Sequence, residues 1–183
     1  MNHRTLVTGF LAFEGFEVNP SALLARSSGR PHELIEVAFD AVEEFLDRLA
    51  VAAPDYDSVL MLGVRGGGTR IEVERVARNH VGASPDVRGQ VIGPAPIEPA
   101  GPDALYGTLF PDDLHWPASH DAGCYLCNYV YYRALRRLPP TIRVGFGHVP
   151  PLNVVPLHEQ QRDLSRLLEL IDSAGFPATI ARA

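Results

Sequence analysis

The hydrophobic and polar positions of this chain follow two alternating periods. Short apolar runs, typical of buried strands, occupy Thr5 to Gly9, Ser58 to Gly63 and Ile142 to His148. Between and after these runs, apolar residues recur at three- and four-residue steps, which is typical of amphipathic helices. The alternation predicts an α/β fold, a three-layer α/β/α sandwich around a largely parallel, mixed central sheet.

Capping residues predict where the helices begin. Asn19 followed by Pro20 indicates a helix start, and Asp40 with Glu43 three residues later indicates another. A partly alternating strand should precede the second of these helices. The expected elements are a helix from Pro20 that stops before Gly29, a strand over Glu33–Phe39, and helices over Asp40–Ala53, from Cys127 onward and over His158–Ser173.

Two glycine-rich stretches interrupt this pattern. Residues 82 to 103 are rich in Gly and Pro and predict a long irregular segment, of a length seen in functional lids or disorder. Arg65-Gly66-Gly67-Gly68 follows a predicted strand but matches neither the dinucleotide nor the P-loop spacing. We therefore expect these glycines to allow a close approach of backbone to a substrate.

Composition and charge exclude several classes of function. The 183 residues fit a single domain over 1–183 that buries about 70% of its unfolded surface. The net charge of −6 and the scattered basic residues argue against a nucleic-acid partner. No apolar run approaches the roughly 20 residues of a membrane span, and the first residues are too short for a signal peptide. We expect a cytoplasmic protein with no membrane partner.

Both cysteines stand at the start of a predicted helix. Ser119, Asp121 and Gly123 precede them and are typical cap and turn residues. Cys127 should lie in or near the first helical turn, where the helix dipole and free N–H groups favour the thiolate. This position predicts a nucleophile. The alternative is that Cys127 is a small apolar core residue.

Three other positions offer partners for such a nucleophile. His148 ends a strand just before two prolines, where its imidazole could act as a base or merely be a hydrogen-bonded structural group. Glu74 lies in an extended charged segment, where it would ordinarily form a solvated surface pair with Arg75. The loop after the first strand carries Phe10, Phe13 and Phe16, which are either core residues or the wall of a ligand site.

Four motifs stand in a fixed order along residues 5 to 150. They are Thr8-Gly9-Phe10-x-x-Phe13 with Asn19-Pro20-Ser21, Glu74-Arg75-Val76-Ala77-x-Asn79, Asp121-Ala122-Gly123-x-Tyr125-x-Cys127-Asn128, and Phe146-x-His148-Val149-Pro150. In this order the motifs resemble those of the type I pyroglutamyl peptidases, also called pyrrolidone carboxyl peptidases.

The resemblance implies a cytosolic cysteine exopeptidase that removes an N-terminal pyroglutamyl residue from peptides through an acyl-enzyme. It assigns the nucleophile to Cys127, the base to His148 and the carboxylate partner to Glu74. It also implies a homotetramer that needs no cofactor and no metal, with pyroglutamyl peptides as its partners. The residues that it assigns to the substrate pocket are Phe10, Phe13, Asn19, Tyr125 and Leu126.

The chain also departs from the family pattern. Ala12 stands where proline is common, Gly68 where arginine is common, and Ala83-Ser84 where an arginine and a bulky apolar residue often precede Pro-Asp. These losses leave open a catalytically weakened relative that binds pyroglutamyl ends without cutting them well.

The two cysteines allow one further interpretation. Cys124-x-x-Cys127 at a helix start has the spacing of a thioredoxin-type dithiol, which would make the chain a thiol-disulfide redox protein with no role for Glu74. Such pairs usually follow an early strand, whereas this pair lies two-thirds along the chain. A zinc site is weaker still, because a second cysteine pair or a suitably spaced histidine pair is missing from the sequence.

Overall fold

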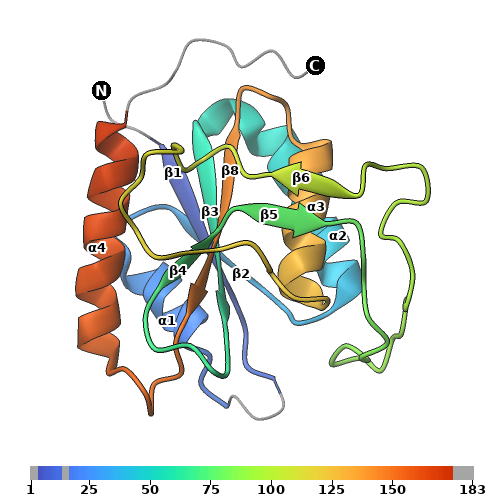
Figure 1. Cartoon of the computed structure of the whole chain (residues 1–183), viewed down its shortest axis with the longest axis horizontal. Helices are drawn as coiled ribbons and strands as arrows, with labels where there is room; N and C mark the ends of the chain where they lie inside the picture. The colour runs from blue at the N-terminus through green and yellow to red at the C-terminus, as the bar shows by residue number, and fades with distance from the viewer. Residues whose placement is uncertain (1–3, 14–16, 175–183) are drawn as a thin grey trace.

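The computed structural model describes residues 4–13 and 17–174, and most of their strands form one mixed sheet. Neighbouring strands in it run parallel, except that the fifth strand is antiparallel to the fourth. The predicted largely parallel, mixed sheet is confirmed. In order across the sheet, the strands are β2 (His32–Ile35), β1 (Thr5–Phe10), β3 (Ser58–Val64), β8 (Arg143–Val149), β4 (Glu72–Glu74) and β7 (Ala118–Ser119) (Figure 1).

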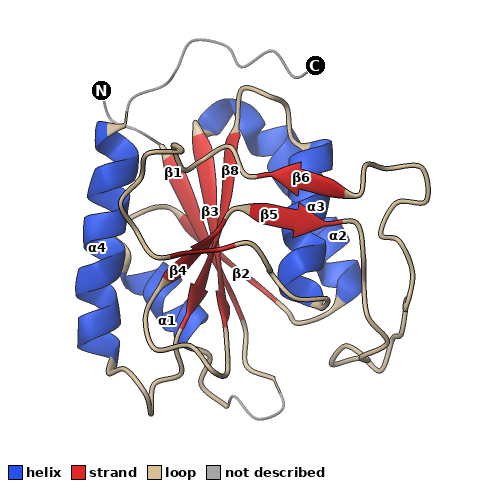
Figure 2. Ribbon diagram, in the orientation of Figure 1, coloured by secondary structure: helices blue, strands red, loops and turns tan. Residues whose placement is uncertain are grey.

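Helices cover both faces of this sheet, as the sandwich prediction requires. Helices α1 (Pro20–Ser27) and α4 (Leu157–Ser173) lie on one side, and α2 (Phe39–Ala52) and α3 (Leu126–Arg137) on the other (Figure 2). A 3-10 turn, Ala53–Asp55, follows α2. A two-stranded antiparallel sheet of β5 (Val76–Arg78) and β6 (Ala104–Tyr106) lies beside α3 (Figure 1).

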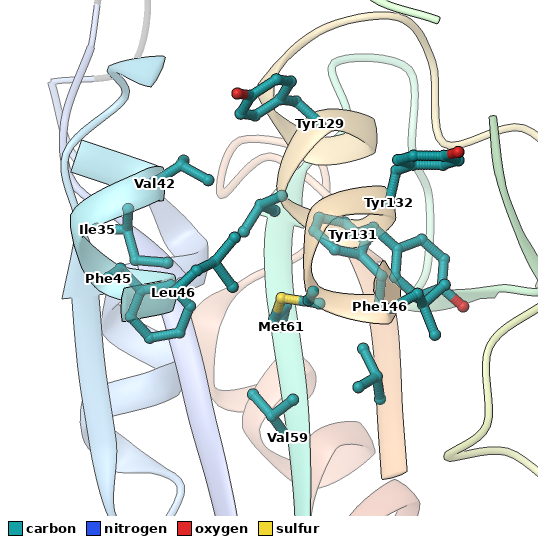
Figure 3. Close-up of a cluster of buried hydrophobic side chains, with 14 of the residues drawn as sticks. Ile35, Val42, Phe45, Leu46, Val59, Met61, Tyr129, Tyr131, Tyr132 and Phe146 are labelled. Atoms are coloured by element: carbon teal, nitrogen blue, oxygen red, sulfur yellow. The ribbon is translucent and has the colours of Figure 1, made fainter. Parts of the chain in front are cut away.

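Each face of the sheet has its own apolar core, because successive residues of a strand point to opposite sides. Along β3, Val59 and Met61 pack toward α2 and α3, while Leu60 and Leu62 pack toward α1 and α4. The continuous apolar run that predicted β3 is thus the signature of a strand buried on both faces. Figure 3 shows the first core, in which Phe45 of α2 and Tyr131 of α3 join Val59, Met61 and Phe146 of the sheet.

The two predicted helix caps differ in outcome. Asn19 caps α1 as predicted, since its side chain accepts the N–H of Ser21 with Pro20 at the first turn. The predicted cap at Asp40 is wrong, because α2 already begins at Phe39. The cap comes instead from Asp86, which lies 47 residues after Phe39 in the sequence. Its Oδ2 accepts the N–H of Phe39 at 2.9 Å. A local sequence pattern cannot show such a distant cap.

The strand predicted over residues 33–39 is shorter than expected. β2 ends at Ile35, where a tight turn from Glu36 to Ala38 leads directly into α2. The extended segment at residues 70–79 divides at Arg75 into β4 of the large sheet and β5 of the small one. This division places Glu74 at the end of a strand inside the large sheet.

The Gly- and Pro-rich segment of residues 82–103 has almost no secondary structure, as predicted, but it is anchored at several points. Val81 and Ala95 form an isolated antiparallel bridge. The amide of Asn79 bonds the backbone of Glu98 and Gly101, and Asp86 binds the start of α2. Among residues 4–13 and 17–174, no helix combines the length and the apolarity needed to cross a membrane.

Candidate active site

Cys127 is the second residue of α3, so the prediction that it lies in the first helical turn is confirmed. A tight turn carries the chain into this helix. The carboxylate of Asp121 accepts the N–H of Gly123 at 2.9 Å, and the hydroxyl of Ser119 accepts the N–H of Asp121 at 3.1 Å. Gly123 has a φ of 81°, a left-handed conformation that favours glycine. These residues therefore build the turn, and Tyr125 occupies the cap position without a side-chain cap bond.

The sulfur of Cys127 lies in a space that Gly63 leaves open. A Cβ atom on Gly63 would be 2.6 Å from Sγ of Cys127 and 2.8 Å from the ring of Phe146. Gly63 pairs with His148 in the ladder of β3 and β8, so these two positions face the same side of the sheet. The thiol of Cys127, which α3 carries, therefore lies over the same face of the sheet as the imidazole of His148.

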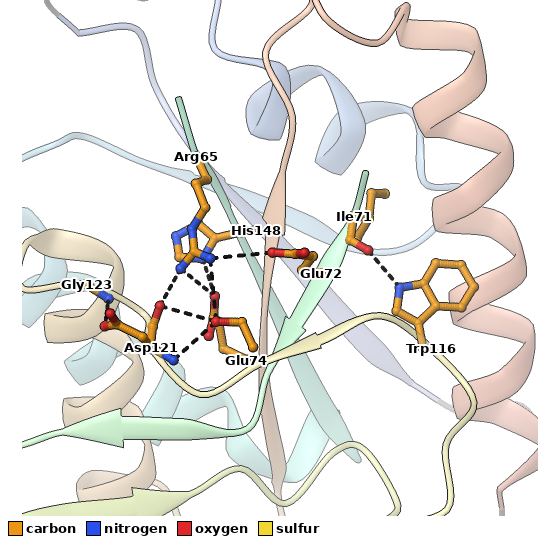
Figure 4. A network of polar contacts seen from close by, with 9 residues as sticks. Arg65, Ile71, Glu72, Glu74, Trp116, Asp121, Gly123 and His148 are labelled. Atoms are coloured by element: carbon orange, nitrogen blue, oxygen red, sulfur yellow. Dashed lines mark hydrogen bonds and ion pairs between the residues drawn. The ribbon is translucent and has the colours of Figure 1, made fainter. Parts of the chain in front are cut away.

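His148 and Glu74 form a buried pair. Nδ1 of His148 lies 2.6 Å from Oε1 of Glu74 (Figure 4). Glu74 pairs with Phe146 across the antiparallel ladder, so that Glu74 and His148 are diagonal neighbours on one face. Their exposed fractions are 0% and 5%. The alternative of a solvated Glu74-Arg75 surface pair is therefore wrong, and Arg75 donates instead to the backbone carbonyls of residues 110–111.

Burial sets the charge state of the thiol. It raises the pKa of Cys127 to about 12, and the charge of Glu74 adds to this rise, while the charge of Arg65 and a backbone hydrogen bond act in the opposite direction. The expectation that the helix start makes Cys127 a thiolate is thus wrong for the free protein. Burial of the thiol outweighs the effect of the helix terminus.

The carboxylate of Glu74 shows the opposite balance. Burial opposes its charge, but hydrogen bonds from His148 and Ser119 and the electrostatic attraction of His148 and Arg65 outweigh this effect and lower the pKa of Glu74. Glu74 is therefore ionised at neutral pH. An ionised carboxylate on Nδ1 leaves Nε2 as the imidazole atom available to a reacting group.

An open pocket lies beside Cys127. All five residues that the family resemblance assigned to the substrate line it, and its walls are largely apolar. Phe16 lies outside the described residues. The lining residues are Phe10, Phe13, Asn19, Val37, Val64, Tyr125, Leu126 and Cys127.

The polar groups of this pocket are largely engaged by the chain itself. The amide nitrogen of Asn19 donates to the carbonyl of Leu11 at 3.1 Å, and its oxygen accepts from the N–H and the hydroxyl of Ser21. Tyr125 donates its hydroxyl to the carbonyl of Pro85 at 2.9 Å. Asn19 therefore holds the loop that carries Phe13 and caps α1, in addition to lining the pocket.

Sequence reasoning missed three residues of this region. Val37 and Val64 complete the pocket wall. The only sequence feature that could have indicated them is their position, since Val37 lies two residues after β2 and Val64 is the last residue of β3. Arg65 was considered only as part of a glycine-rich stretch, yet its guanidinium lies 2.9 Å from Oε1 of Glu74. Gly68, which departs from the family pattern, donates its N–H to the carbonyl of Arg65 and closes the turn that begins there.

The two cysteines are both free and their sulfurs lie against different glycines. Cys124 is exposed, and a Cβ atom on Gly82 would be 2.9 Å from its sulfur. Cys127 is partly buried against Gly63. In the part of the chain that the structure describes, no cluster of three or more His, Cys, Asp or Glu side chains is arranged to hold a metal ion.

Comparisons with known proteins agree with this geometry. The family model described as pyroglutamyl peptidase matches residues 3–167. The pyrrolidone-carboxylate peptidase of Thermococcus onnurineus (strain NA1) is 34% identical over 185 residues, which cover 89% of this chain and 88% of that protein. The corresponding protein of Klebsiella pneumoniae (strain 342) is 34% identical over 173 residues, covering 79% of this chain and 77% of that protein.

Solved structures give the same result. The crystal structure of pyrrolidone carboxyl peptidase from Thermus thermophilus superposes with a TM-score of 0.75 at 33% identity, covering 90% of this chain and 98% of that one. Pyroglutamyl peptidase I from Bacillus amyloliquefaciens has a TM-score of 0.75 at 26% identity, covering 91% and 93%. The chain therefore belongs to the pyroglutamyl peptidase family and is a hydrolase of the peptidase class.

Proposed function

We propose that this chain is a cysteine exopeptidase that releases an N-terminal pyroglutamyl residue from peptides. Cys127 is the nucleophile, His148 the base and Glu74 the carboxylate that orients the imidazole. The observation that carries the proposal is the 2.6 Å contact between Glu74 and His148, on the sheet face where the thiol of Cys127 lies beside an apolar pocket. Nucleophile, base and orienting group in this order make up the recurrent constellation of acyl transfer.

The reaction begins with the thiol rather than a standing thiolate, because burial raises the pKa of Cys127. His148 takes the proton as the sulfur attacks the carbonyl that joins the pyroglutamyl ring to the next residue. The imidazolium that forms is stabilised by the ionised Glu74. His148 then gives the proton to the departing amine, and afterwards activates the water that releases the acyl group from sulfur.

The start of α3 suits the developing oxyanion. The first N–H bonded within this helix is that of Tyr129, so the N–H groups of Leu126, Cys127 and Asn128 point out of the helix start. Backbone donors that are fixed before the reaction stabilise charge as it forms. The amide of Asn128 holds this end of the helix, since it bonds the backbone of Arg78 and His80.

The pocket fits the chemistry of the pyrrolidone ring. The ring is uncharged and nearly flat, and aromatic walls such as Phe10 and Phe13 bury its methylene groups. A cyclised N-terminus carries no ammonium group. The largely apolar lining, without an acidic side chain, therefore favours this substrate over a free amino terminus.

A fluorogenic pyroglutamyl amide tests the proposal. Cys127→Ala and His148→Ala should abolish turnover, while Glu74→Gln should leave measurable activity because an orienting carboxylate contributes less than the nucleophile or the base. Arg48→Met, in an exposed ion pair with Glu33, is the control for a folded surface variant. Full turnover by Cys127→Ala would end the assignment.

The same assay separates the peptidase from a weakened relative. Gly68, Ala83 and Ser84 carry the departures from the family pattern, and the last two are exposed. A relative that only binds would show saturable binding of a pyroglutamyl peptide in calorimetry without release of the fluorophore. We expect turnover, because the pocket, the thiol and the Glu74-His148 pair occur together.

We further propose, on the family resemblance, that the chain acts in the cytoplasm as a homotetramer. Multi-angle light scattering tests the assembly. Four copies of the 20.0 kDa chain are expected. A monomer at micromolar concentration contradicts the tetramer and leaves the peptidase proposal unaffected.

A further inference from the structure

The guanidinium of Arg65 connects the proposed acid-base pair to the turn before the nucleophile. It donates to Oε1 of Glu74 at 2.9 Å and to the backbone carbonyl of Asp121 (Figure 4). Both of these bonds come from Nη2, while Nη1 lies 3.4 Å from Oε2 of Glu72 and 3.5 Å from the hydroxyl of Ser119. One side chain thus contacts β4, β7 and the turn that leads into α3.

The backbone of Arg65 is fixed on both sides. Its N–H donates to the carbonyl of Val149 on β8 at 3.0 Å, and its own carbonyl accepts the N–H of Gly68 at 2.9 Å. A Cβ atom on Gly68 would be 3.2 Å from that carbonyl, so the turn is compact. The side chain is therefore presented from a rigid position next to the strand that carries His148.

One carboxylate oxygen receives both partners. Oε1 of Glu74 takes Nδ1 of His148 and the guanidinium of Arg65, and two donors on one oxygen hold the carboxylate in a single orientation. The bond from Arg65 to the carbonyl of Asp121 then fixes the turn relative to that carboxylate. Nη2 makes both of these contacts and Nη1 reaches Glu72 and the hydroxyl of Ser119, so the planar guanidinium spans four groups at once, whereas an ammonium group is a single point of charge.

We propose that Arg65 is a positioning residue of the peptidase, which holds Glu74 against His148 and ties the turn at residues 119–121 to this pair. The inference rests on the proposed function, because it assigns Arg65 a task within that catalytic machinery. Arg65 touches Glu74 and the turn, and it acts on the reaction through them.

Charge gives the same residue a second effect. The groups that interact electrostatically with the thiol are Glu74 on β4, Arg65 just after β3 and Tyr125 just before α3. After burial, the charge of Glu74 is the next cause that raises the pKa of Cys127, and the charge of Arg65 lowers it. Removal of Arg65 leaves the negative charge of Glu74 unbalanced beside the thiol.

Two variants separate position from charge. Arg65→Met removes both, and Arg65→Lys keeps the charge but loses the planar fork. The first quantity to measure is kcat/KM on the pyroglutamyl amide. The second is the rate of iodoacetamide alkylation at Cys127 between pH 7 and 10, with mass spectrometry to distinguish Cys127 from Cys124. Arg48→Met is the matched control, because it makes the same change in an exposed ion pair.

The expected pattern differs between the two variants. Arg65→Met should lower kcat/KM about 100-fold, the loss typical of a misplaced catalytic group. It should also slow alkylation of Cys127 about tenfold at fixed pH, which corresponds to a rise of about one unit in the thiol pKa. Arg65→Lys should lose part of kcat while alkylation stays close to the parent rate. Arg48→Met should match the parent in both measurements.

Other outcomes overturn the inference. If Arg65→Met matches the parent in kcat/KM and in alkylation, Arg65 has no positioning role. If its activity falls only in proportion to the unfolded fraction seen in thermal melts, with parental alkylation, its role is structural and the inference is wrong. If the parent itself fails to cleave the amide, the proposed function fails, and the alkylation rates still decide whether Arg65 acts on Cys127.

Discussion

The hydroxyl of Tyr131 donates a 2.9 Å hydrogen bond to the backbone carbonyl of Glu74. Tyr131 lies four residues after Cys127, so both face the same side of α3. The helix that carries the proposed nucleophile is thereby attached to Glu74, the strand residue in contact with the proposed base, His148. This bond joins a buried side chain of α3 to the backbone of β4 beside the site.

Tyr131→Phe should therefore weaken both folding and catalysis. The loss of a buried hydrogen bond leaves the carbonyl of Glu74 without its donor and costs about 1–3 kcal/mol in the free energy of unfolding. Tyr132→Phe is a close control, because Tyr132 is equally buried on the same helix and donates to the carbonyl of Pro102 at 2.9 Å, away from the site. Urea denaturation should show similar losses for both variants, while kcat should fall only for Tyr131→Phe. Equal kcat values would contradict a link between α3 and Glu74.

The two phenylalanines of the pocket should separate binding from stability. Phe10 is 4% exposed and belongs to the core, so Phe10→Ala should cost about 3–5 kcal/mol in the free energy of unfolding. Phe13 is partly exposed on the pocket wall, so Phe13→Ala should mainly raise KM for the pyroglutamyl amide. Melting temperatures and steady-state kinetics together test this contrast. An unchanged KM with a large drop in the melting temperature of Phe13→Ala would make Phe13 a core residue only.

The order in which the two cysteines react should follow exposure and thiol pKa. Cys124 is exposed, whereas burial raises the pKa of Cys127 to about 12. The thiolate is the reactive form, so its fraction at Cys127 increases with pH throughout the range below that value. We expect iodoacetamide to modify Cys124 first with retention of activity, and Cys127 later with loss of activity, faster as pH rises from 7 to 10. Early modification of Cys127 at pH 7 would mean that the free thiol is already ionised.

Asp86 should make the stability of the fold depend on pH. Burial opposes its charge, but hydrogen bonds from the backbone N–H groups of Phe39, Gln90 and Arg88 lower the pKa of Asp86. A carboxyl whose pKa is lower in the folded state stabilises the fold above its ordinary pKa of about 3.9, and this contribution is lost as pH falls through the folded value. Asp86→Ala should cost about 1 kcal/mol at pH 7, as for a lost helix cap, and less as pH falls below about 3.9.

Urea denaturation at pH 7 and pH 3 measures this difference. The control is Asp113→Ala, an exposed carboxyl elsewhere in the chain. A cost for Asp86→Ala that stays constant over this range would show that the carboxylate charge contributes nothing.

The elements that the sequence predicted well are those whose pattern is set by burial. The run from Ser58 to Gly63 is buried in both cores and the stripe after Cys127 is buried in one, so their hydrophobic patterns predicted both the type and the position of these elements. The start of α2 was mispredicted because its cap, Asp86, comes from a distant loop. Hydrophobic periodicity and local capping residues cannot indicate a hydrogen bond between residues that are 47 positions apart in the sequence.

In the candidate site, too, contacts between residues distant in the sequence could not be predicted from local pattern. The residues brought together here stand in motifs spread from Phe10 to His148, and family resemblance, not local pattern, placed them in one site. Glu74 appeared to be a surface residue because its neighbours are charged, and only the pairing of β4 inside the sheet buries it. Arg65 escaped notice because its role depends on contacts with β4 and a turn more than 50 residues away.

The antiparallel pairing of β4 with β8 has a consequence for insertions and deletions. Glu74 reaches His148 only because the register pairs it with Phe146, two residues away on the same face. One residue added to β4 ahead of Glu74 would turn its carboxylate to the opposite face of the sheet, whatever the new residue is. The same addition between the exposed Ala83 and Ser84, in an irregular loop, costs only a fraction of a kcal/mol in closure entropy. Length changes should therefore accumulate in that loop during divergence, while the three residues of β4 keep a fixed count even where their side chains vary.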